Sequence, residues 1–114
     1  MLSPTIRTKV WLELEGRFVI GEGGLDLLEA VERLRSLTGA AQAVGWSYRH
    51  AWGYLRNAER VLGAKLVVTL PGRGGARGTR LSPVGRLFLK QLQRARRGAH
   101  AAARQGWNSS RRQN

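Results

Sequence analysis

Hydrophobic and polar positions at the start of the chain alternate with the period of a β-strand. Val10, Leu12 and Leu14 share one face of the stretch KVWLEL, and a tryptophan and a glutamate take the other face. This is the pattern of a strand that is buried on one side. A Glu-Gly turn and the apolar stretch RFVI follow. We therefore expect a β-hairpin over residues 9–20.

After the hairpin the period changes to that of a helix. Leucines and a valine recur at helical spacing between residues 27 and 37, which predicts a first helix over residues 26–36. Asp26 has the side chain of an N-cap, and Gly39 lies just past the predicted end.

Two further helical patterns follow, separated by Gly45. Thr38 is expected to cap a short helix of small residues, and the glycine is expected to form a sharp turn in the left-handed conformation. Ser47 is a suitable cap for the next helix, residues 47–62, which presents Ala51, Leu55, Ala58 and Leu62 to a core. Residues 38–62 therefore have the pattern of a helix-turn-helix.

The stretch AKLVVTL is short and β-branched, PGRGGARG is dense in glycine, and TRLS is again extended in pattern. Residues 64–82 are predicted to form two strands joined by a basic loop, which is a wing. A phosphate-binding loop would need a Gly-Lys-Ser/Thr ending, which is absent. An arginine-glycine segment that binds RNA, or a loop without function, stays open as an alternative.

A last helix is predicted over residues 83–103. Its apolar residues form a narrow stripe, which favours pairing with a second copy of the chain, although packing within its own domain is the alternative. Residues 104–114 are polar and basic and are expected to be a disordered tail. Residues 1–103 then form one domain, mainly α with a small β component.

Charge is distributed unevenly along the chain. The formal net charge is +13, yet seven basic residues balance seven acidic ones up to Glu59, and thirteen Lys and Arg follow with no acid. Such a field attracts polyanions, and nucleic acid is the commonest polyanion that a protein of this class meets. A solvated basic tail or a contact with an anionic membrane is the alternative.

Other function classes find little support in the sequence. There is no cysteine, which excludes disulfides and thiolate metal sites. Two histidines, His50 and His100, and the lack of carboxylates after Glu59 argue against catalysis and against a metal site. We expect no cofactor and no small-molecule effector. No apolar run is long enough for a membrane span and no secretory signal is evident, so we expect a cytoplasmic, nucleoid-associated protein.

In a helix-turn-helix the front of the second helix enters the major groove. Arg49 is suited to bind guanine through two hydrogen bonds, and Ser47 and Tyr48 are suited to contact phosphates or a thymine methyl group. Trp46, Trp52 and Tyr54 could instead serve the core, as aromatic residues on amphipathic helices usually do. The positions predicted to contact DNA are Thr38, Ser47, Tyr48, Arg49, Trp52, Arg56, Arg73, Arg77 and Arg80.

Residues 25–89 resemble the N-terminal DNA-binding domain of the molybdate-responsive regulator family ModE, in a single-domain form, and more distantly the LysR-type winged helix. The most specific parts are GWSYRHAW and GRGGARGTRLSPVGR. The resemblance implies a dimeric winged helix-turn-helix with DNA contacts at Ser47, Tyr48, Arg49 and the wing arginines. The chain ends at residue 114, which leaves no room for the C-terminal oxyanion-binding domains of ModE, so molybdate sensing is not implied.

Taken together, these patterns predict a sequence-specific regulator of transcription. It would bind double-stranded DNA as a homodimer paired through its C-terminal helix. The alternative is a basic architectural protein that binds DNA or RNA without sequence preference.

Overall fold

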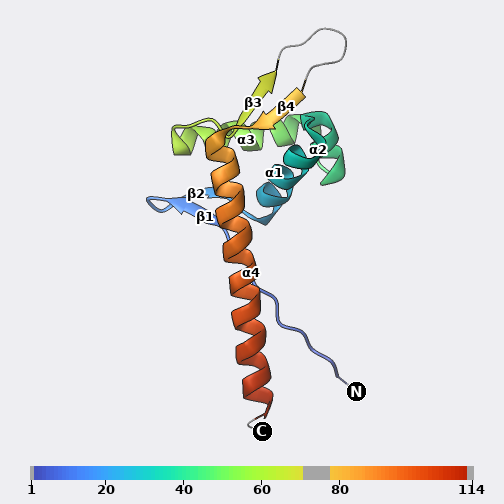
Figure 1. Ribbon diagram of the computed structural model, residues 1–114, viewed down its shortest axis with the longest axis vertical. Helices are drawn as coiled ribbons and strands as arrows, with labels where there is room; N and C mark the ends of the chain where they lie inside the picture. Colours follow the sequence, from blue (N-terminus) through green and yellow to red (C-terminus); the bar gives the residue numbers. More distant parts are fainter. Residues whose placement is uncertain (1, 71–77, 113–114) are drawn as a thin grey trace.

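The computed structural model describes residues 2–70 and 78–112 of the chain. Most elements gather at one end of the molecule, and one long helix runs away from that end (Figure 1). In chain order the elements are β1 (Leu12–Leu14), β2 (Arg17–Ile20), α1 (Glu22–Leu34), α2 (Leu37–Ala43), α3 (Tyr48–Leu62), β3 (Val67–Leu70), β4 (Gly78–Leu81) and α4 (Pro83–Arg112).

Strands β1 and β2 form the predicted hairpin, with strands that begin later than expected. They pair antiparallel, with Leu12 opposite Ile20 and Leu14 opposite Arg17. Glu15 and Gly16 both have positive φ, 51° and 79°, as a two-residue turn between twisted strands requires. Ile20 is buried in the core.

Helix α1 begins four residues before the predicted start, so the assignment of Asp26 as its N-cap is wrong. The N-cap is Gly21, and the carboxylate of Asp26 lies inside the helix, where it faces Arg96 of α4 at 3.5 Å. Gly23 and Gly24 belong to the first turn of α1, where the aromatic side chains of Trp46 and Tyr54 lie close to them. The helix also ends earlier than predicted, at Leu34.

The helix-turn-helix is confirmed, but one of its caps differs. Ser36 caps α2, since its Oγ accepts a hydrogen bond from the amide of Gly39 at 3.0 Å, and the prediction that Thr38 is the cap is wrong. Gly45 forms the turn at φ 77°. Ser47 caps α3 as predicted, with its Oγ 3.0 Å from the amide nitrogen of His50.

Strands β3 and β4 pair antiparallel, from Val67 opposite Leu81 to Leu70 opposite Gly78. They are the two predicted strands of the wing, and the loop between them, residues 71–77, lies outside the described residues. Ser82 joins the second strand to the rest of the domain, because its amide donates to the carbonyl of Leu66 at 2.8 Å.

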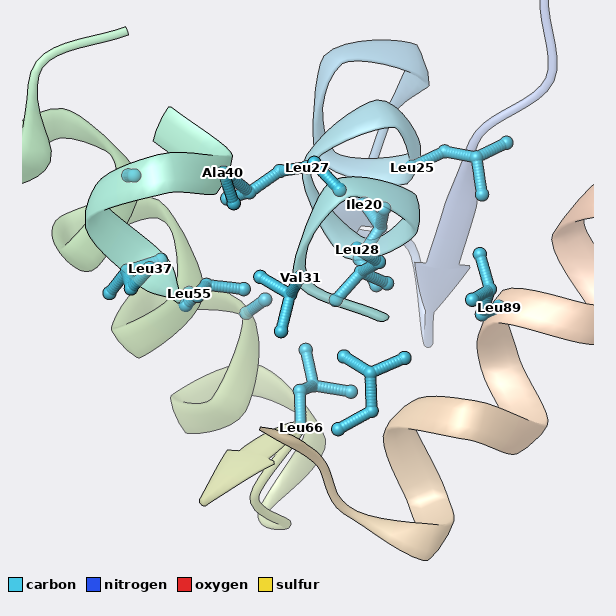
Figure 2. Close-up of a cluster of buried hydrophobic side chains, with 14 of the residues drawn as sticks. Ile20, Leu25, Leu27, Leu28, Val31, Leu37, Ala40, Leu55, Leu66 and Leu89 are labelled. Carbon is cyan, nitrogen blue, oxygen red and sulfur yellow. The ribbon is translucent and has the colours of Figure 1, made fainter. Parts of the chain in front are cut away.

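The core lies where α1, α2 and α3 meet, above Leu66 and beside the start of α4 (Figure 2). Leu27, Leu28 and Val31 of α1 are at its centre with no exposed surface. The other helices contribute small or branched side chains, among them Ala40, Ala51, Leu55, Leu89 and Leu92.

Helix α4 contacts α1 over its first half and continues well beyond it (Figure 1). Arg96 lies between Asp26 and Glu29, and the amide of Gln93 donates to Glu29 at 2.7 Å. The prediction of a disordered tail is wrong for residues 104–112, which continue the helix. No proline follows Pro83, so nothing in the backbone stops a helix that has already been nucleated.

Candidate nucleic-acid interface

Helix α3 has one buried side and an exposed remainder. Ala51, Leu55 and Ala58 are almost completely buried against the core. Arg49 and Arg56 are exposed and lie away from the buried residues. The first turn, capped by Ser47, is also exposed, so the front of α3 is free to approach a ligand.

An aromatic cluster anchors one flank of α3 to the start of α1. The ring of Trp46 lies edge-on to that of His50, with centroids 4.3 Å apart, and 5.1 Å from that of Tyr54. A side chain at Gly23 would place its Cβ only 2.8 Å from Trp46. The glycines of α1 therefore allow α3 to lie close to this helix.

Tyr54 makes the polar contact in this cluster. Its hydroxyl oxygen accepts a hydrogen bond from the amide of Gly21, the N-cap of α1, at 2.8 Å. Burial raises the pKa of Tyr54, and hydrogen bonds with the backbone of Gly21 and Gly24 oppose that rise. The tyrosine thus supplies a partner to an amide that the α-helix itself leaves free.

The opposite flank of α3 borders a groove along β3. Tyr48 is 53% exposed and Trp52 is 48% exposed, and the guanidinium of Arg56 lies 5.2 Å from the centre of the Trp52 ring. We call this hollow the helix–strand groove. It is lined by Leu37, Tyr48, Trp52, Leu55, Arg56, Glu59, Lys65, Val67, Val68, Thr69 and Thr79.

Glu59 fixes the groove at its far end. One oxygen of its carboxylate accepts hydrogen bonds from the amides of Leu66 and Val67, at 2.8 and 3.3 Å. The last turns of α3 and the start of β3 are thereby tied together. The separation between the exposed face of α3 and the first wing strand is set by this contact.

The seven predicted site residues that the structure describes are all exposed. Ser47, Tyr48, Arg49, Trp52 and Arg56 lie together on α3, whereas Thr38 lies on α2 and Arg80 on β4. Arg73 and Arg77 lie outside the described residues. The expectation that Trp52 serves the core is wrong, because its ring stands at the surface, whereas Trp46 packs against α1.

Three surface residues of the groove were missed in the sequence. Lys65, Val68 and Thr69 are exposed and line the groove opposite α3. Lys65 belongs to the acid-free half of the chain, which was the available signal. Val68 and Thr69 are successive exposed positions of β3, so the strict alternation that would have identified an outward face in the sequence does not hold there.

Positive charge dominates this surface. Arg49, Arg56 and Lys65 are exposed, and the one acidic residue of α3, Glu59, is engaged by backbone amides. Within residues 2–70 and 78–110, ion pairs form between Arg96 and two carboxylates of α1 and nowhere else. The arginines of α3 and β4 are therefore not neutralised by neighbouring carboxylates.

A family model described as "Bacterial regulatory helix-turn-helix protein, lysR family" matches residues 24–86. The match covers more than half of the chain, and it runs from α1 through the helix-turn-helix and the wing strands to the start of α4. The chain belongs to the lysR family. Within this lysR-family region, α2, Gly45 and α3 form the helix-turn-helix unit.

Two curated relatives confirm the resemblance to ModE. The "Molybdenum transport protein ModE" of Herbaspirillum seropedicae is 37% identical over 71 residues, which is 60% of this chain and 26% of the relative. The "Molybdenum-pterin-binding protein MopB" of Rhodobacter capsulatus is 35% identical over 70 residues, 61% of this chain and 26% of the relative. The chain thus spans about a quarter of the length of these two relatives.

Solved structures share the fold. The crystal structure of Vibrio fischeri DarR in complex with DNA aligns with a TM-score of 0.56 and 21% identity, over 76% of this chain and 28% of that chain. The complex of the CbnR DNA-binding domain with DNA aligns with a TM-score of 0.55 and 23% identity, over 79% of this chain and 94% of that one. The winged helix-turn-helix expected from the sequence is confirmed.

Two other kinds of site were sought in the described residues. Among them, histidine and carboxylate side chains do not gather in threes as a metal ion would require. No helix in residues 2–70 or 78–112 combines the length and the apolar character needed to cross a bilayer.

Proposed function

We propose that this lysR-family chain is a sequence-specific regulator of transcription that binds double-stranded DNA through α3 and the wing. The observation that carries the proposal is the exposed front of α3, on which Arg49, Trp52 and Arg56 stand free above a buried face. We infer that the chain acts by binding DNA, in the cytoplasm at the nucleoid, rather than by catalysis.

Each predicted contact has a role that suits its position. Arg49 is assigned to base edges, where a bidentate contact with guanine contributes about 1–3 kcal/mol of discrimination. Ser47 and Tyr48 at the start of α3, and Thr38 on α2, are assigned to the phosphate backbone. Trp52 and Arg56 border the helix–strand groove and are assigned to one strand of the duplex.

The wing is assigned to the backbone or the minor groove beside the site of α3. Arg80 on β4 is exposed, and Arg73 and Arg77 are included on the strength of the sequence alone. Lys65 and Val68 join this set because they line the helix–strand groove. Arginines of the wing would add affinity for any sequence, while α3 provides the sequence preference.

A homodimer through α4 is part of the proposal. One face of α4 carries no charge, and its members follow one another at alternating steps of four and three residues, the spacing of a coiled-coil seam. Leu87 beside this face is 52% exposed. The uncharged face consists of Val84, Phe88, Gln91, Ala95, Gly98, Ala102, Gln105 and Ser109. Val84 and Phe88 pack against the core of the same chain, so the pairing is assigned to the part from Gln91 onward.

A second candidate function is architectural binding of DNA or RNA without sequence preference, which the net charge of +13 favours. Selection from a random pool of double-stranded DNA, at near-physiological salt, separates the two. Enrichment of a motif with two inverted half-sites is the result expected for a dimeric regulator. Binding without enrichment would overturn the proposal and favour the architectural function.

A further inference from the structure

Helix α4 carries a row of cations away from the interface described above. Lys90, Arg94, Arg97 and Arg104 follow one another at intervals of four, three and seven residues, so they share one face of the helix. All four are exposed, and this face differs from the one that contacts α1 and from the uncharged face. We call these four residues the α4 ridge.

The cations of the ridge destabilise α4 by repelling one another, and no carboxylate in the described residues offsets this repulsion. Helix α4 contains no acidic residue, so cations three or four positions apart on it repel one another and destabilise the helix. An ordinary solvated face mixes both signs of charge. The carboxylates of α1 that lie against α4, Asp26 and Glu29, are engaged by Arg96 and Gln93 on another face.

The dimensions of the ridge suit the backbone of a nucleic acid. At 1.5 Å per residue, Lys90 and Arg104 are about 21 Å apart along the helix axis, which is the length of about six phosphates along one strand of a duplex. Three of the four residues are arginine, the side chain best matched to phosphate oxygens. An anionic membrane fits less well, because the exposed remainder of α4 lacks the broad apolar face of an interfacial helix.

The N-terminal segment adds charge beside the ridge. The Thr8 hydroxyl is hydrogen-bonded to the ring of His100, which brings this segment against the middle of α4. Arg7 and Lys9 flank Thr8 and are exposed. The positive surface around α4 is therefore wider than the helix itself.

We propose that the α4 ridge is a second binding surface for double-stranded DNA, which contacts the phosphate backbone without reading sequence. Helix α4 points away from the end of the molecule that holds α3 and the wing strands (Figure 1). Arg104 lies about 31 Å along the helix from Pro83. A duplex on the ridge is thus a different segment from the duplex on α3, and the chain joins the two.

A two-duplex titration tests this inference. The wild-type chain is first saturated with an unlabelled operator duplex from the selection experiment, and a labelled 20-bp duplex of scrambled sequence is then added while anisotropy is measured between 50 and 200 mM salt. The ridge variant is R94Q/R97Q. The control, R17Q/R33Q, also removes two positive charges, but from exposed positions of β2 and α1.

The wild-type chain and the control are expected to bind the second duplex with a steep salt dependence. The ridge variant should bind it about tenfold more weakly at 0.1 M salt, with a salt slope that is smaller by about two, because each phosphate contact contributes about 0.9 to that slope. The variant K90Q/R94Q/R97Q/R104Q should abolish it. Operator affinity should be equal in all four proteins.

Equal binding of the second duplex by the ridge variant and the control would overturn the inference. Binding of anionic lipid vesicles but not of the scrambled duplex would overturn it as well. If the pool yields no operator, the proposed function fails, and the ridge is then tested in an R49Q/R56Q chain, in which the front of α3 has lost its charge. If the R49Q/R56Q chain loses duplex binding when the ridge residues are also replaced, the result supports the inference. If duplex binding is unchanged, the result refutes it.

Discussion

Arg49 lies on the exposed side of α3, in the first turn of this helix, and Ser47 caps that turn. Because the backbone is fixed there, the direction in which the guanidinium leaves the helix is fixed within the reach of one side chain. This position makes Arg49 the residue whose loss should affect sequence choice more than overall affinity.

Replacing Arg49 with alanine is expected to flatten sequence preference at one base pair of each half-site. The expected loss is about 1–3 kcal/mol of discrimination between guanine and other bases. Competition binding with single-base operator variants measures it. R33A, which removes an exposed arginine from α1, is the control and should keep the full preference; equal loss in both variants would contradict the assignment of Arg49.

Tyr54 should give the stability of the fold a dependence on alkaline pH. Burial raises the pKa of Tyr54 above the ordinary tyrosine value of 10.0, so the folded state retains the phenolic proton that the unfolded state releases. The stabilisation is complete below pH 10 and is lost as the pH rises through the folded-state pKa. The expected result is a fall in unfolding free energy above pH 10 that is absent in Y54F.

Denaturant unfolding between pH 8 and pH 11 measures this difference. Y48F is the matched control, since Tyr48 is exposed and Tyr54 is intact in that variant. Y54F should also be about 1 kcal/mol less stable at neutral pH, because the amide of Gly21 loses its acceptor. If the free energy of unfolding falls with pH in the same way in wild type and Y54F, burial of the phenol does not contribute to the pH dependence of stability.

At the scale of elements, the approach of α1 to α3 depends on glycine. A Cβ at Gly24 would collide with the Tyr54 ring, whereas a Cβ at Gly53, in the middle of α3, has open space within 4 Å. G24A should therefore destabilise the fold by about 1–3 kcal/mol through overpacking. G53A should stabilise it by about 0.5–1 kcal/mol through the loss of glycine's backbone freedom.

Thermal unfolding of G24A and G53A compares the two effects in one assay. Opposite shifts in Tm are the expected outcome, since both changes add one methyl group to a helix. A similar fall in Tm for both variants would mean that helical context, and not the contact with Tyr54, decides the cost.

The elements were predictable where periodicity and turn chemistry agreed. The hairpin, the helix-turn-helix and the wing strands all follow from such agreement, as with Gly45 between its two helices. The start of α1 was not predictable, because glycines are weak helix formers, yet Gly23 and Gly24 lie in its first turn, close to Trp46 and Tyr54. Tertiary packing there overrides local propensity.

The cap of α2 and the surface position of Trp52 show the same limit within the site. Ser36 and Thr38 are both good cap residues two positions apart, and only the backbone conformation selects Ser36. Trp52 has the composition of a core residue, but the core side of α3 is filled by Ala51 and Leu55. The type of site was thus predictable, while the direction of single side chains needed the packed structure.

At the scale of the whole molecule, most elements gather at one end and α4 extends from them. The principal extents are 64 × 34 × 21 Å, and α4 runs along the longest of them (Figure 1). The uncharged face and the α4 ridge lie on different sides of α4, so the proposed pairing of two copies leaves both ridges accessible.

A glutamate on the uncharged face is expected to disrupt the dimer. A102E places charge in the seam between two copies, while A101E adds the same residue one position earlier, on the side of the ridge. Sedimentation equilibrium should show that the dissociation constant of the dimer rises at least tenfold in A102E, which is about 1.4 kcal/mol. The constant should change little in A101E. A wild-type chain that stays monomeric at all concentrations would refute pairing through α4.

Glu59 holds α3 and β3 at one separation through two amide hydrogen bonds. Under the proposed function, α3 and the wing bind one duplex, and two elements tied at one separation adjust little to the width of a groove, so the duplex deforms to meet them. Base steps that compress or bend at little cost then fit better than stiff A-tracts, even at base pairs that no side chain touches. The flexibility of the DNA, and not only its base edges, becomes part of what this chain selects.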